Sequence, residues 1–92
     1  MRRRVVITGI GWVTPLGAEI QGVWERLLRG ESGVGYTTLF DASNFPTKIS
    51  AEVRDWDLTD VGENPADWKY QGRHTHFAIG AAKKAVADSG IE

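Results

Sequence analysis

Two glycines near the N-terminus, Gly9 and Gly11, have a spacing that occurs in phosphate-binding turns. Gly9 and Gly11 follow the β-branched run Val5–Thr8 and precede a stretch with helical periodicity. The backbone N–H groups of such a turn can bind phosphate oxygens. However, Thr14 stands where the third glycine of the dinucleotide-binding pattern G-x-G-x-x-G belongs, and Pro15 follows it. Nucleotide binding by an α/β protein is therefore the third and most distant of the functions considered.

The remaining catalytic or metal-binding residue types form no recognisable site. His74 and His76 are the only histidines. Two residues apart on a helix, they point in different directions and cannot share a metal ion. We expect them on the helix surface or in capping roles. No serine lies in a nucleophile-elbow pattern. The 92 residues contain no cysteine, so they hold no disulfide, thiolate ligand or thiol nucleophile. We predict no catalytic residue, cofactor or metal site here.

Acidic residues are concentrated between residues 52 and 67, where Arg54 is the single basic residue. Their spacing fits no calcium-binding loop. Runs of charged residues usually lie at the surface, in contact with water. We therefore predict an acidic surface segment that is anchored to the protein by Trp56 and Trp68. The acidic residues are Glu52, Asp55, Asp57, Asp60, Glu63 and Asp67.

Composition limits the class of protein and its partners. A chain of 92 residues forms one domain at most. Its net charge of −1 gives no reason to expect nucleic acid or an anionic membrane as partner. Arg2–Arg4 before an apolar run resembles the start of a signal peptide, but glycines interrupt the run and no cleavage site follows. No stretch could span a membrane. The lack of cysteine favours an intracellular over a secreted protein, and the location we expect is the cytoplasm.

Periodicity predicts four elements in the order strand, helix, short strand, helix. Val5–Thr8 is apolar on both faces, which is typical of a strand inside a covered sheet. The spacing of apolar residues predicts helices over residues 18–29 and 74–89, ended by Gly30 and Gly90. Residues 48–53 alternate as in a half-buried strand, and residues 30–47 are predicted to be loop. We expect close packing at Gly22, and a main core of Val5, Val6, Ile7, Trp24, Leu27 and Phe77.

Several motifs occur in an order that resembles the β-ketoacyl-acyl-carrier-protein synthases. They are "RRVVITGIGWVTPLG" at residues 3–17, W-x-x-L-L-x-G-x-S-G at 24–33, Phe40-Asp41, "PTKISAEV" at 46–53, and F…AA-x-x-A-x-x-DSG at 77–90. The match looks closest to the type II elongating synthase of fatty acid biosynthesis. It implies an α/β fold, the N-terminal fragment of a thiolase-like layered fold. Residues 1–92 would be the N-terminal part of the synthase N-terminal domain, incomplete relative to the family fold. Gly9 and Gly11, which follow the first predicted strand, would then allow the backbone to pack closely against a neighbouring segment.

The resemblance also implies a function. Such enzymes are acyltransferases that condense an acyl thioester with malonyl-acyl-carrier protein and release carbon dioxide. Their nucleophilic cysteine and two catalytic histidines lie beyond the matched region, and neither His74 nor His76 stands at a catalytic position. We therefore expect a segment of a 3-oxoacyl-acyl-carrier-protein synthase that is inactive alone. The alternative is a non-catalytic binding or self-association module derived from that fold.

Basic residues around the start of the last helix dock the acidic carrier protein in this family. Lys69 and Arg73 match two of those positions, whereas Gly72 stands where some relatives have another base. Charge complementarity of this kind steers an acidic partner. The expected partners are acyl carrier protein and further copies of the chain.

Overall fold

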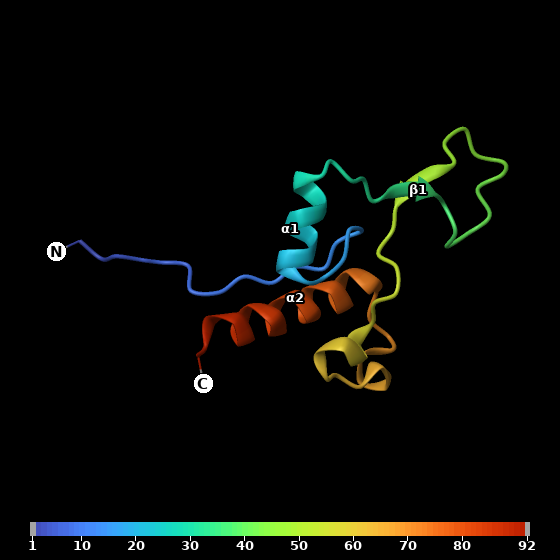
Figure 1. Ribbon diagram of the computed structural model, residues 1–92. Helices are drawn as coiled ribbons and strands as arrows, with labels where there is room; N and C mark the ends of the chain where they lie inside the picture. Colours follow the sequence, from blue (N-terminus) through green and yellow to red (C-terminus); the bar gives the residue numbers. More distant parts are fainter. Residues whose placement is uncertain (1, 92) are drawn as a thin grey trace. The chain divides into compact units, whose positions relative to one another are not determined.

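The computed structural model describes residues 2–91 (Figure 1). They divide into two compact units: Val13–Trp56 forms one, and the described residues before and after it form the other. We call these the central unit and the terminal unit. The central unit contains α1 (Ile20–Leu28), β1 (Val34–Tyr36) and β2 (Ile49–Ala51). The terminal unit contains the 3₁₀ helices η1 (Leu58–Val61) and η2 (Pro65–Trp68) and the helix α2 (Arg73–Ser89).

Helix α1 confirms the predicted helix but not its expected burial. It begins two residues later than predicted and ends one residue earlier. Val23 is buried, whereas Trp24 is 51% exposed and Leu27 47% exposed, so their placement in the core is wrong. Helical periodicity shows which face is apolar but not which segment covers it. Close packing at Gly22 is also wrong, since the nearest atom to an added Cβ would be 4.0 Å away, on Glu19.

Strands β1 and β2 form an antiparallel pair in which Val34 lies opposite Ala51 and Tyr36 opposite Ile49. The predicted short strand, residues 48–53, is thus confirmed over Ile49–Ala51. The loop predicted for residues 30–47 is wrong where β1 lies. With three residues and a glycine at its centre, β1 is too short to give a detectable alternation of polar and apolar side chains.

The first predicted strand is absent. Among the described residues, the only β pairings join β1 to β2 and Thr14 to Gly17. Val5 is 94% exposed and Ile7 is 86% exposed, and Val6 is also exposed, so none of the three belongs to a core within this chain. A strand needs a neighbour for its backbone hydrogen bonds, and no described segment pairs with this one.

Gly9 and Gly11 instead allow close packing against α2, as the resemblance implied. A Cβ on Gly9 would lie 2.3 Å from the carbonyl oxygen of Ala85, and one on Gly11 would lie 2.3 Å from that of Ala81. Between them, the backbone N–H of Ile10 donates to the Asp88 carboxylate at 3.0 Å. Figure 1 shows this segment running along α2. Only a backbone without side chains fits at this distance.

Helix α2 follows its prediction closely. It begins at Arg73, one residue early, and ends at Ser89 as predicted, and Gly90 follows it with a φ of 73°, the expected left-handed cap. Helix η1 packs against α2, and its Leu58, 1% exposed, is the most deeply buried large side chain of the described residues. Phe77 is only half-buried. The buried apolar residues of the two units are Val23, Ala42, Trp56 and Leu58.

The acidic stretch folds into η1 and η2, each started by a side-chain cap. Asp57 accepts from the backbone N–H of Thr59, and Asn64 accepts from that of Ala66. Trp56 is buried and Trp68 is half-buried, which confirms both as anchors. Glu52 departs from the prediction of a solvated surface, because it is only 6% exposed.

We predict that Gly11→Ala destabilises the chain by about 1–3 kcal/mol or more, because the added methyl group overlaps the α2 backbone. Gly22→Ala is the matched control. It adds the same methyl group to an open helical position and should stabilise by roughly 0.4–1 kcal/mol. Urea denaturation of the two variants and the wild type measures both effects. Equal stability of the Gly11 variant and the wild type would contradict the close approach.

Candidate functional site

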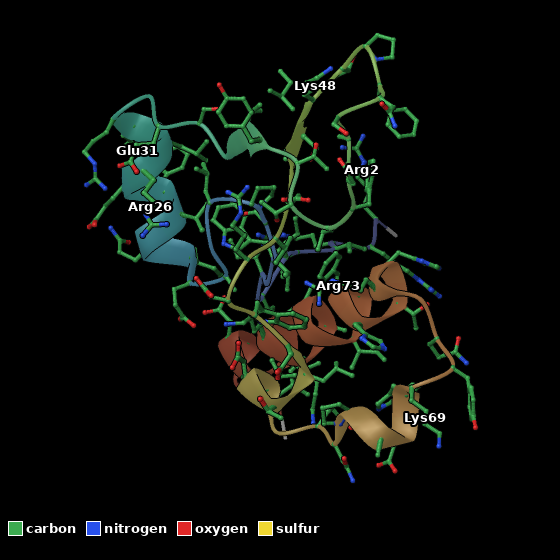
Figure 2. All side chains as sticks on the ribbon, turned by 90° about the vertical axis from the view of Figure 1, so that its right-hand side faces the viewer. Arg2, Arg26, Glu31, Lys48, Lys69 and Arg73 are labelled. Atoms are coloured by element: carbon green, nitrogen blue, oxygen red, sulfur yellow. The ribbon has the colours of Figure 1, made fainter. Side chains whose placement is uncertain are left out.

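Lys69 and Arg73 lie at the two ends of the turn that joins η2 to α2. Lys69 directly follows η2, and Arg73 is the first residue of α2. The backbone N–H of Gln71 donates to the Trp68 carbonyl at 3.0 Å, which closes the turn. Gly72 then caps the helix in an extended conformation. Figure 2 labels the two cationic residues, both exposed, within the terminal unit.

Each of these cations lies over an aromatic ring. The Lys69 Nζ is 5.0 Å from the centre of the Tyr70 ring, and the Arg73 Cζ is 4.8 Å from that of Phe77. Attraction between a cation and the negative face of a ring holds the long side chain without removing its charge from water. The turn therefore presents two positive groups with restricted freedom.

Arg73 also acts on a neighbouring carboxylate. The pKa of Asp57 lies below its usual range, first because the Thr59 hydroxyl donates to it and then because the Thr59 backbone N–H does. The positive charge of Arg73 lowers that pKa further. Asp57 therefore stays ionised at the start of η1 and partly balances the charge of Arg73.

The two histidines have different roles, as their spacing predicts. His76 places its Nε2 2.9 Å from the Trp68 carbonyl oxygen, at the last residue of η2. This contact confirms a capping role. His74 lies exposed on the first turn of α2. Within residues 2–91, no three histidine or acidic side chains cluster as metal ligands would.

Glu63 joins the segment before the turn to the body of α2. One of its carboxylate oxygens accepts from the Trp68 indole at 3.2 Å, and the other accepts from Lys83 at 2.8 Å. These two donors, Lys83 foremost, hold the pKa of Glu63 below its usual range. Sequence reasoning treated Glu63 as one of six solvated acids, and nothing in its spacing marks it as a link.

Glu52 has a comparable role in the central unit. Its buried carboxylate accepts from the backbone N–H and hydroxyl of Thr38 and from the backbone N–H of Leu39, at 2.8–3.2 Å. Arg54 adds an ion pair at 3.3 Å. The Thr38 hydroxyl is the chief cause that lowers the pKa of Glu52, burial opposes it, and the backbone donors and Arg54 assist. Glu52 thus fixes the chain that follows β1.

The family of the chain follows from comparison with known proteins. The family described as "Beta-ketoacyl synthase, N-terminal domain" matches residues 2–92. The chain belongs to this family. The 3-oxoacyl-[acyl-carrier-protein] synthase 2 of Coxiella burnetii is 48% identical over 91 residues, and that of Synechocystis is 38% identical over 88. These matches cover 99% and 96% of the chain but only 22% and 21% of the relatives.

A solved structure supports the fold. The ishigamide ketosynthase/chain length factor has a TM-score of 0.86 and 33% identity to this chain, and it covers all of the chain. The chain covers 23% of that structure. The likeness confirms the α/β fold class as an N-terminal piece of a thiolase-like fold. No helix in the described part of this ketoacyl synthase segment is long and apolar enough to cross a bilayer.

We predict that Glu52→Gln weakens the dependence of stability on pH. Because folding lowers the pKa of Glu52 from its ordinary value of 4.5, its contribution is present above that value and is lost as the pH falls through the folded pKa. Thermal midpoints measured between neutral pH and acid should fall less steeply in the variant, with Asp41, Asp57 and Glu63, whose pKa values are also lowered, contributing to the remaining slope. Glu25→Gln on the exposed face of α1 controls for the loss of one charge. An unchanged slope in the Glu52 variant would contradict the expectation.

Proposed function

We propose that the chain is the N-terminal segment of a 3-oxoacyl-acyl-carrier-protein synthase of fatty acid biosynthesis, working in the cytoplasm. The whole enzyme condenses an acyl thioester with malonyl-acyl-carrier protein and releases carbon dioxide. The observation that carries the proposal is the family match over residues 2–92, with relatives of that name at 38% and 48% identity. Residues 1–92 are then the N-terminal part of the synthase N-terminal domain.

Within that enzyme, the segment binds the carrier protein and does no chemistry itself. Acyl transfer through a covalent thioester needs a thiolate, and these residues hold no cysteine. The imidazole of His76 is engaged with a backbone carbonyl. By contrast, Lys69 and Arg73 present exposed positive charge beside a turn, which suits an acidic partner. On its own, the segment is inactive.

Reversing both charges should weaken binding of an acidic acyl carrier protein. For Lys69→Glu with Arg73→Glu we expect about a tenfold loss of affinity, since each exposed pair contributes on the order of 0.5–1 kcal/mol. Wild-type affinity should also fall as salt rises, because screening acts beyond about 8 Å at physiological ionic strength. Titration calorimetry at two salt concentrations measures both effects.

The double variant Arg2→Glu with Arg3→Glu is the matched control for net charge. Both residues are exposed, and both lie outside the turn. Gly72→Lys tests the opposite change, since it adds a basic residue where some relatives have one and should strengthen binding. The backbone of Gly72, with φ −71°, accepts a side chain, provided that the exposed His74 ring moves, since an added Cβ would lie 2.7 Å from its Cε1 and 2.8 Å from its Nδ1. Binding that is equal in all four proteins would refute the docking site.

A second candidate function is self-association, and the exposure of Val5 and Ile7 favours it. An extended, apolar segment without a strand partner offers backbone N–H and C=O groups to another chain. Burying its side chains against a second copy would contribute about 25 cal/mol for each Å² of apolar surface. The exposed apolar run Val5–Ile7 therefore suits pairing with a second copy of the chain.

We predict that Val5→Lys with Ile7→Lys shifts the chain toward monomer, because charge on an edge blocks strand pairing. Sedimentation velocity over a wide concentration range should show association of the wild type and less of it in the variant. Leu28→Lys with Leu39→Lys makes the same change at two other exposed apolar positions. A wild type that is monomeric at every concentration would exclude this function.

A further inference from the structure

Trp68, the residue before Lys69, is held from two sides. Its carbonyl oxygen accepts from the His76 ring at 2.9 Å and from the backbone N–H of Gln71 at 3.0 Å. Its indole N–H donates to Glu63 at 3.2 Å. Both the backbone and the side chain of Trp68 are therefore restrained.

These contacts tie the segment before the turn to α2. His76 lies on the first turns of α2, and Lys83, which donates to Glu63 at 2.8 Å, lies about two turns further along. Two separate points on one helix thus hold Glu63, just before η2, and Trp68, the last residue of η2. Two points of attachment restrict rotation of the segment, which a single one would leave free.

The bond from His76 to Trp68 closes a loop that contains both docking cations. Lys69 follows Trp68 directly, and Arg73 precedes His76 by one helical turn. Unrestrained, the four backbone steps from residue 69 to residue 73 could extend to about 14 Å. The Gln71 bond closes the turn itself, and the His76 bond ties it to the helix that carries Arg73.

We propose that His76 and Glu63 are positioning residues for carrier-protein docking. Acting through Trp68, they hold Lys69 at a set place relative to Arg73, so that both cations meet an acidic partner together. The gain is preorganisation, because a charge that is already in place loses less conformational freedom on binding. This inference rests on the docking function proposed above, and it assigns residues that neither the family motif nor the spacing of charges indicates.

The His76 contact requires a particular ring nitrogen to be the donor. A carbonyl oxygen can only accept, so the Nε2 atom must carry the hydrogen. That hydrogen is present in one neutral tautomer and in the imidazolium form alike. The contact needs only an N–H donor, so an uncharged side chain that carries one should replace it.

A double-mutant cycle tests the proposal. Lys69→Ala should lower the affinity for acyl carrier protein about twofold to fivefold in the wild type. In the His76→Leu background the same change should have a clearly smaller effect, since one of the two attachments of Trp68 to α2 is gone. In the His76→Gln background, where a side-chain amide can donate to the carbonyl, the full effect should return. Coupling of this kind separates positioning from a general loss of stability.

Trp68→Phe provides a second route if His76→Leu does not fold. It removes the indole donor to Glu63 and keeps an aromatic ring, and it should also reduce the effect of Lys69→Ala. Additive effects in both backgrounds, with wild-type binding intact, would overturn the positioning roles alone. A wild-type chain that shows no salt-dependent binding would overturn the docking function and, with it, this inference.

Discussion

The approach of an extended backbone to a helix backbone underlies the arrangement of the terminal unit. Successive glycines two apart on an extended chain repeat about every 6.6–6.8 Å, and helix residues four apart repeat about every 6 Å. Gly9 and Gly11 can therefore meet Ala85 and Ala81 in turn, with the Ile10 N–H bonded to Asp88 between them. No other residue type permits a separation of 2.3 Å between a Cβ position and a carbonyl oxygen. The same helix then packs against η1 and holds the turn through His76.

The sequence predicts those elements whose formation depends on residues close together in the chain, and it fails where an element depends on a distant segment. The two helices have local signals, apolar spacing and a glycine that takes a left-handed conformation at or just after the cap, and the structure confirms them within one or two residues. The apolar run Val5–Thr8 predicts a buried strand, but a strand is buried only where another strand pairs with it. No described segment pairs with this one. β1 contains too few residues for a pattern. Glu52 resembles its acidic neighbours in sequence, and its burial depends on donors from Thr38 and Leu39, fourteen and thirteen residues away.

The candidate site was accessible from the sequence only in part. Lys69 and Arg73 were predicted as docking residues from the resemblance to a family. Two basic residues four positions apart do not by themselves indicate a binding site. The contacts that hold them could not be predicted, since Trp68 and His76 are eight residues apart and Glu63 and Lys83 are twenty apart. The spacing of the two histidines did predict that they would diverge. At about 100° per residue, a separation of two places them on different faces, and one is exposed while the other bonds to η2.

The docking turn and the self-association surface should respond differently to added salt. Measurements at several salt concentrations can therefore distinguish the two. Docking through Lys69 and Arg73 depends on charge, so added salt weakens it by screening. Association through Val5–Ile7 depends on apolar burial and on backbone pairing, and sulfate or phosphate strengthens apolar burial. The exposed apolar run and the docking turn both belong to the terminal unit, so a single preparation reports on both. Binding that falls with salt while self-association rises can only come from two distinct surfaces, because one surface cannot respond to the same ions in opposite directions.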